Sequence, residues 1–382
     1  MTATTTPSGP LADALARLPL VARPTPVAPR LEQRVAELDE LARQTAETGD
    51  TDLATAIHHR AAVLAFDRGH AGAAYGLCDL HTHLFLAGKP LDGMRAVQAL
   101  TLQATAADLL VREGRAQQAL SLLAEVERAI AGNQDAALPG RSLFLAGLTT
   151  DRSARDEVRE WWAGVRLAHG TRALLADGRW AQARRHTETD RMWQPALGDA
   201  QQIAVIAMAL DGKHVSALTL IDEAPVSTLW EHVVAEVLKV SCALIADGSA
   251  TYEQLVAMCD THDPYNPSGD PLFDTQLTLT VVDLLAAADR PGPARQYYKV
   301  ATEWALAAQE GYSARSVLDH NLAAGLPEGH WRELTAITER AGLRATAVPP
   351  DLDERITAAV LRAGAAITAA VAGDRTSPPP RP

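Results

Sequence analysis

The chain has 382 residues, of which 47% are hydrophobic and 4% aromatic, and its formal net charge is −12. This composition excludes an intrinsically disordered protein, because the apolar residues suffice for a large core. The acidic balance argues against direct nucleic-acid binding, which needs a dominant basic surface. Only four of the 35 basic residues are lysine, a usage that, with abundant alanine, is typical of a GC-rich bacterial genome.

Residues 1–29 are predicted to form a flexible leader, with room for one helical turn near Leu11 to Leu18, because proline recurs along them. The prolines are Pro7, Pro10, Pro19, Pro24, Pro26 and Pro29, and each removes a backbone donor that a helix needs. The first ten residues lack the basic and apolar regions of a signal peptide. Three scattered cysteines and no evident apolar run of about 18 residues complete the prediction of a cytoplasmic protein without a membrane span.

Almost every segment after the leader is predicted to be helical. Apolar residues recur at three- and four-residue steps, as in Ile203, Ile206, Ala207 and Leu210, which is the period of an α-helix with one buried face. Useful lengths of alternating strand pattern are absent. The sequence therefore predicts an all-α fold.

A short phrase recurs along this helical region: an apolar stretch, an acidic or polar residue, Gly, and Ala five residues later. It occurs at Gly49 with Ala54, Gly69 with Ala74, Gly114 with Ala119, Gly178 with Ala183, and Gly212 with Ala217. Glycine permits a left-handed cap where a helix ends. Alanine lets the following helix approach closely.

The phrase resembles the tetratricopeptide repeat (TPR), in which Gly closes the first helix of a hairpin and Ala packs in the second. Gly114 with Ala119, and Gly212 with Ala217, match best. The resemblance implies a right-handed α-solenoid of antiparallel helical hairpins, a TPR-like superhelix, that binds a protein or peptide partner in its concave groove. Steps of 34 and 36 residues after Gly178 fit the family period, whereas the earlier spacings depart from it. Near Arg290 the turn is rewritten, with Ala294 apparently one position early.

These observations divide the chain into four parts. We expect a flexible leader over 1–29, a TPR-like array over 31–326, a C-terminal helical cap over 327–373 and a disordered tail over 374–382. Turn residues predict loops or irregular hairpins over 133–155 and 260–274.

One predicted helix carries the best candidate for a binding surface. Its residues recur at three- and four-residue steps and are Arg159, Trp162, Arg166, His169 and Arg172. Trp and Arg dominate peptide and anion recognition, so this face could line the groove. The structural alternative is a buried Trp162 whose neighbours form ion pairs within the array, for instance with Asp156 or Glu157.

The histidine groups and a search for standard motifs provide no candidate for a metal or catalytic site. His58-His59 and His81-Thr82-His83 are read as polar faces of a helical hairpin, because metal pairs favour a spacing of three or four residues. No phosphate loop, nucleophile elbow, zinc-protease motif or paired C-x-x-C occurs. We therefore predict no metal, no cofactor and no catalytic residues.

Three functions remain open at this point. The first is a non-enzymatic scaffold or regulatory module that binds a peptide or protein. The second is a ligand-sensing regulatory partner, since such arrays resemble the sensing lobes of bacterial regulators. The third is a helical-scaffold enzyme or accessory protein of specialised metabolism, with its site on Arg159, Trp162, Arg166, His169 and Arg172.

Overall fold

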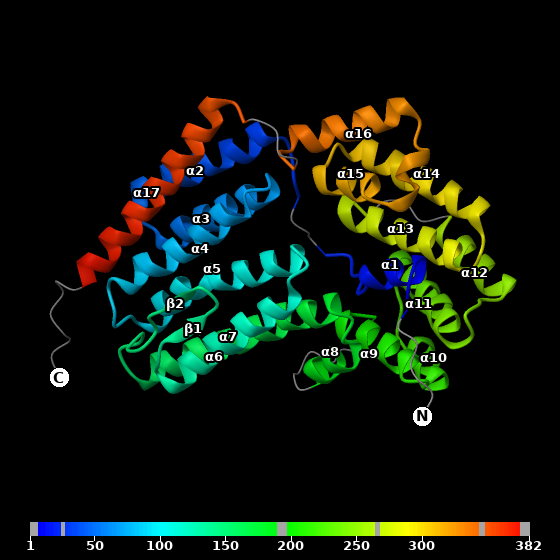
Figure 1. Ribbon diagram of the computed structural model, residues 1–382, viewed down its shortest axis with the longest axis horizontal. Helices are drawn as coiled ribbons and strands as arrows, with labels where there is room; N and C mark the ends of the chain where they lie inside the picture. Colours follow the sequence, from blue (N-terminus) through cyan, green and yellow to red (C-terminus); the bar gives the residue numbers. More distant parts are fainter. Residues whose placement is uncertain (1–6, 24–26, 189–196, 264–267, 344–347, 375–382) are drawn as a thin grey trace. The chain divides into compact units, whose positions relative to one another are not determined.

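The computed structural model describes residues 7–23, 27–188, 197–263, 268–343 and 348–374. The structure is 76% helical and 2% strand, which confirms the all-α prediction (Figure 1). The predicted tail from 375 onward, and leader residues 1–6 and 24–26, lie outside the described residues. The chain divides into two compact units, each with its own core.

Unit 2 comprises residues 31–177 and 342–382. Its elements are α2 (Leu31–Thr48), α3 (Thr51–Asp67), α4 (Ala71–Leu86), α5 (Gly93–Arg112), α6 (Ala116–Gly132), β1 (Ala136–Leu138), β2 (Arg141–Leu143), α7 (Arg152–Ala176) and α17 (Pro350–Asp374). Each of α3 to α6 packs against the next helix along the chain, and α7 packs against both α5 and α6. The two strands pair antiparallel within the predicted 133–155 segment, around a turn at Gly140 with φ 76°.

Unit 1 comprises residues 1–30 and 178–341. Its elements are α1 (Pro10–Ala16), α8 (Trp180–Glu188), α9 (Asp199–Leu210), α10 (His214–Asp222), α11 (Leu229–Asp247), α12 (Tyr252–His262), α13 (Pro271–Ala287), α14 (Pro291–Ala308), α15 (Gly311–Leu318), the 3-10 helix η1 (Asn321–Gly325) and α16 (Glu328–Arg340). Successive pairs α9–α10, α11–α12 and α13–α14 pack together, and α13 also contacts α11 and α15.

The recurring Gly and Ala of the sequence have one local geometry. Every Gly of the phrase has a φ between 69° and 83°, and every paired Ala is fully buried. Asp289, with φ 58°, takes the place of Gly in the rewritten turn, and Ala294 follows five residues later at 1% exposure. The backbone N–H of Arg290 donates to the Leu285 carbonyl at 2.9 Å, as the N–H of Lys213 does to the Met208 carbonyl. The spacing at Ala294 is therefore regular, which corrects the displacement expected from sequence.

The domain boundaries differ from those expected. The array expected over 31–326 is divided at Asp177. The expected cap over 327–373 is divided too, because α16 packs on α15 in unit 1 whereas α17 packs on α2 and α3 in unit 2. The physical reason is the buried stripe of α17, which comprises Leu352, Ala359, Ala363, Ile367 and Val371.

Helix α17 also corrects the expectation that no segment is apolar enough to span a membrane. Residues Pro350–Gly373 meet that criterion of length and composition. The same helix packs against α2, α3 and α4, and the Val360 carbonyl accepts a hydrogen bond from His58 of α3 at 3.1 Å.

The leader contains an ordered segment rather than the flexible one expected. Helix α1 begins at Pro10, where proline is tolerated because the first helical N–H needs no partner, and it packs on α13. Ala14, Leu15, Leu18 and Leu20 are at most 4% exposed. Pro10 is the first residue of this helix, and Pro7 and Pro19 lie on either side of it.

Candidate functional site

The structure splits the binding surface predicted on α7. Trp162 is 1% exposed, and its indole N–H donates to the Leu123 carbonyl of α6 at 3.1 Å. Arg159 lies 3.7 Å from Asp156 on the same helix. Trp162 is therefore part of the core of unit 2 and presents no ring to a ligand.

The cationic residues of that set meet carboxylates of neighbouring helices. Arg166 pairs with Glu127 of α6 at 2.6 Å, and Arg172 pairs with Asp108 of α5 at 3.3 Å. His169 lies 3.8 Å from the same Asp108 oxygen. Burial raises the pKa of Asp108, but His169 and Arg172 lower it by more than burial raises it. The net pKa is therefore below its usual range. These contacts match the structural alternative, with Glu127 and Asp108 as the partners.

His58 and His81 are core residues and not the polar faces expected. Their Nδ1 atoms lie 3.0 Å apart, His58 Nε2 contacts the Val360 carbonyl and His81 Nε2 contacts the Gln98 carbonyl. Carbonyls only accept, so both Nε2 atoms carry protons in these contacts. Burial lowers the pKa of both rings, that of His81 to about 3. Each neutral ring therefore donates its one proton to a carbonyl, and no proton is left for the contact between the two Nδ1 atoms. Among the described residues, no group of three or more His, Cys, Asp or Glu side chains could hold a metal ion.

A more extensive set of polar contacts lies in unit 1, where the N-terminal segment (residues 7–23 and 27–30) covers a face of the helices. Helix α13 has twelve buried residues and α9 has nine, so both need apolar cover on more than one side. Helix α1 packs on α13 and α11, and Leu20 follows it onto α9 through Gln202. The segment thereby completes the burial of α9 and α13.

Two side chains bind the backbone of this segment. The Leu20 N–H donates to Gln202 Oε1 at 2.8 Å, and Gln202 Nε2 donates to the Leu20 carbonyl at 2.7 Å. Further along, the Ala28 N–H donates to Glu310 Oε1 at 2.6 Å, and the Gly311 N–H donates to the Ala28 carbonyl at 3.0 Å. Gln202 is fully buried. The main chain of the segment is therefore held by hydrogen bonds at two points, Leu20 and Ala28, as that of a peptide ligand would be.

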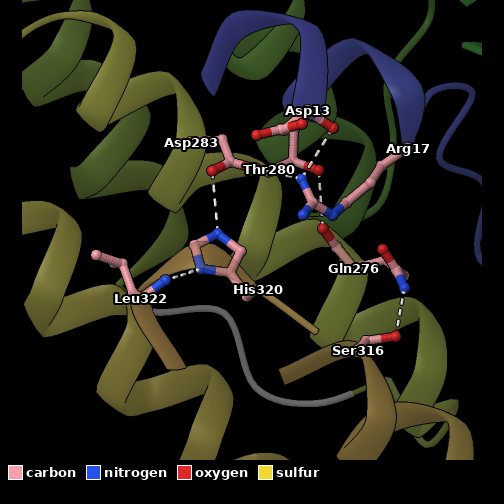
Figure 2. A network of polar contacts seen from close by, with 8 residues as sticks. All are labelled: Asp13, Arg17, Gln276, Thr280, Asp283, Ser316, His320 and Leu322. Atoms are coloured by element: carbon pink, nitrogen blue, oxygen red, sulfur yellow. Dashed lines mark hydrogen bonds and ion pairs between the residues drawn. The ribbon is translucent and has the colours of Figure 1, made fainter. Parts of the chain in front are cut away.

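A buried carboxylate pairs with Arg17, the residue at the C-terminal end of helix α1. Asp283 of α13 has a fully buried side chain, and one of its oxygens pairs with the Arg17 guanidinium. The other oxygen accepts from His320 Nε2 at 3.0 Å. Figure 2 shows Asp283 with Arg17 and His320 directed toward it from different elements. Gln276, Thr280 and Asp283 share this face of α13, since they are four and three residues apart.

The tautomer of His320 follows from its second contact. The Leu322 N–H donates to His320 Nδ1 at 3.1 Å, so Nδ1 carries the lone pair and Nε2 carries the proton given to Asp283. The ring stacks on Tyr298, with centroids 5.0 Å apart. Both ring nitrogens are occupied, which leaves His320 no free nitrogen for acid–base catalysis and makes it a support for Asp283.

Three further groups with possible chemistry, two thiols and a lysine, are buried or already paired. Burial raises the pKa of the Cys78 and Cys242 thiols to about 12, which suppresses the reactive thiolate. A pocket of about 210 Å³ lies among α10, α11 and α12. Its lysine, Lys239, contacts Asp222 at 3.3 Å and Glu236 at 3.1 Å, so its charge is matched within the wall.

The sequence carried one signal for the Asp283 site that the helical pattern concealed. Asp283 stands inside the apolar run from Leu277 to Leu285, and an aspartate in such a helix is rarely buried without a partner. The identity of that partner was not accessible, because Arg17 lies 266 residues away in a segment predicted to be flexible.

A scan against protein-family models, a search of curated proteins and a search of solved structures each gave no match. The resemblance to tetratricopeptide repeats stays a prediction carried by the Gly and Ala positions.

Proposed function

We propose that this chain is a non-enzymatic helical-repeat scaffold of the TPR-like kind in a bacterial cytoplasm. Its recognition face is formed by α9, α11, α13 and the start of α15, and it binds an extended segment of a protein partner. The observation that carries the proposal is the two-bond contact between Gln202 and the backbone of Leu20.

That contact favours peptide binding because of what it recognises. A carboxamide that meets both the N–H and the carbonyl of one residue selects an extended backbone and not a particular side chain. At Ala28 the N–H and the carbonyl are also both bound, the first by Glu310 Oε1 and the second by the Gly311 N–H. The N-terminal segment is then the internal ligand of unit 1, and a partner segment with the same backbone path takes its place.

The apolar side chains supply most of the affinity. Leu15, Leu18 and Leu20 are at most 4% exposed. Full burial of such a side chain contributes about 1.5–3 kcal/mol. Because the segment is covalently attached, its effective concentration is in the range of about 1 mM. A free partner must therefore bind tightly or arrive when the segment is displaced.

The test is to turn the internal ligand into a free one without removing it. A protease site placed within residues 24–26 of the full chain allows the folded protein to be cut, which leaves residues 1–23 bound only by the described contacts. A fluorescent peptide of residues 7–23 is then added, and its exchange is followed by anisotropy while circular dichroism reports the fold.

We expect the labelled peptide to replace the cut fragment and the helical signal to persist. Gln202→Ala weakens binding, because the Leu20 backbone loses both hydrogen bonds. Lys299→Ala on α14 is the control, since Lys299 is exposed and pairs with Glu303 of its own helix. A fragment that never exchanges, or a chain that unfolds once the fragment leaves, would show that residues 7–23 are simply part of the core.

A further inference from the structure

At one position, Asp283, the recognition face contacts a side chain of the N-terminal segment and not its backbone. Asp283 is fully buried, in the middle of the apolar helix α13, and its charge faces an arginine of the N-terminal segment. We propose that Asp283 is an arginine-recognition subsite, and that a partner segment taking the place of residues 7–23 carries an arginine at the position of Arg17. This inference rests on the proposed function and names the chemistry of its partner.

Residues other than the arginine hold the carboxylate of the subsite in place. His320 donates to Oδ1 of Asp283 at 3.0 Å, and the Leu322 N–H fixes the His320 ring from its other side. This leaves Oδ2 directed at Arg17. A carboxylate held in this way meets the guanidinium without first having to reorient, and preorganisation of this kind favours affinity.

The guanidinium fits this subsite better than an ammonium would. Arg17 Nη1 donates to the Asp13 carbonyl at 3.0 Å and also to Asp283. Arginine is planar, has five donors and is more weakly hydrated than lysine, so it suits a buried carboxylate. An uncharged side chain there leaves the Asp283 charge without a counterion.

The surrounding residues define the rest of the partner's pattern. Leu15, Leu18 and Leu20 lie at positions −2, +1 and +3 relative to Arg17, and all are buried. Residue Arg23, by contrast, pairs with Asp199 at an exposed site, 2.8 Å away. The partner segment thus has the form Leu-x-Arg-Leu-x-Leu, and the net charge of −12 on the chain favours the approach of a basic segment.

The experiment uses the cut full chain and four synthetic peptides of residues 7–23. One has the native sequence, two have lysine or citrulline in place of Arg17, and one has citrulline in place of Arg23. Citrulline keeps the shape of arginine and removes its charge. Competition against the labelled native peptide gives each dissociation constant.

We expect citrulline at position 17 to weaken binding on the order of 100-fold, because it leaves a buried carboxylate unpaired. Lysine there weakens binding by about tenfold or more. Citrulline at position 23 changes binding only about two- to five-fold, as for an exposed ion pair.

Two chain variants separate recognition from folding. Asp283→Asn removes the buried charge, so the ratio of citrulline-17 to native dissociation constants falls toward one. His320→Phe keeps a ring on Tyr298 but loses the donor to Asp283, so the ratio of the citrulline-17 to the native dissociation constant also falls. The ratio is a readout that a purely structural role of His320 would leave unchanged.

The outcomes distinguish the two proposals. If the native peptide does not bind the cut chain, the proposed function fails and the arginine subsite fails with it. If all four peptides bind alike, or if Asp283→Asn leaves the preference for arginine intact, peptide binding stands and the subsite is wrong.

Discussion

At the scale of residues, the recurrent Gly and the Ala five positions later set the geometry of each helix junction. Gly212 and Asp289 form the same left-handed cap, with φ of 76° and 58°, and the same backbone bond closes both turns. The two differ in cost, because a Cβ in that conformation is strained and glycine has none. Asp is among the few residues that tolerate it.

This difference can be measured in the free energy of unfolding. We expect Gly212→Ala to destabilise unit 1 by about 1–2 kcal/mol, although no atom lies within 4 Å of the added Cβ. The reverse change, Asp289→Gly, should stabilise it by up to about 1 kcal/mol. Urea unfolding of the two variants provides the comparison. Equal stability of both variants and the parent chain would show that the caps carry no strain.

The buried histidines make stability depend on pH. Burial lowers the pKa of His81 to about 3, lowers that of His58, and lowers that of His262 to about 4. In the unfolded chain these rings take up protons near pH 6.5, so the unfolded state binds more protons below that pH. Stability is therefore fully present above about pH 6.5 and is lost as the pH falls toward the folded values.

We expect each such ring to contribute a slope of up to about 1.4 kcal/mol per pH unit below pH 6.5. Urea unfolding of the parent and of His81→Gln between pH 7 and pH 5 tests this. The variant is less stable at pH 7, because the Gln98 carbonyl loses the donor that His81 Nε2 supplies, but its stability falls less steeply in acid. Identical slopes for the two chains would be incompatible with a neutral, buried His81.

Residue patterns predicted the caps but not the partners of buried groups. The Gly and Ala spacing is local, so the sequence contained the whole signal. Trp162 was ambiguous, because a Trp and several cations on one helix face suit a groove and an internal ion-pair network equally. Only the positions of Leu123, Glu127 and Asp108 decide between them.

At the scale of elements, helix α17 packs through its buried stripe and comes especially close to the backbone of Gly88. An added Cβ at Gly88 would lie 1.9 Å from Val371 Cγ1 of α17. Glycine is thus required there for packing, and not for its backbone freedom. The buried stripe from Leu352 to Val371 follows α2, α3 and α4, which is why residues 350–374 belong to unit 2.

We therefore expect Gly88→Ala to destabilise unit 2 by about 1–3 kcal/mol, as overpacking does, and to speed hydrogen exchange near Val371. Gly76→Ala within α4 is the matched control, since nothing lies within 4 Å of its added Cβ; it should stabilise the helix by up to about 1 kcal/mol. Val371→Ala combined with Gly88→Ala should recover part of the loss. If Gly88→Ala behaves like Gly76→Ala, the close approach of α17 is wrong.

At the scale of the whole molecule, segments distant in sequence complete each unit. Residues 1–30 belong with 178–341, and residues 342–382 belong with 31–177. Sequence periodicity could predict the helices, because each helix records its own buried face. It could not predict these associations, since the buried stripe of a helix does not indicate which distant segment covers it. The recurring prolines of residues 1–29 left room for a helical turn near Leu11 to Leu18, but they did not indicate that this helix packs on α13.

The central claim is that the N-terminal segment is a replaceable ligand of unit 1. A ligand of this kind detaches in a partial opening that costs less free energy than global unfolding. Native-state hydrogen exchange in low urea measures that cost at the Leu20 amide, which donates to Gln202, and compares it with amides in the middle of α13. We expect a distinctly smaller opening free energy at Leu20 than in α13. Equal values, with the same urea dependence, would mean that the segment leaves only when unit 1 unfolds and would contradict the claim.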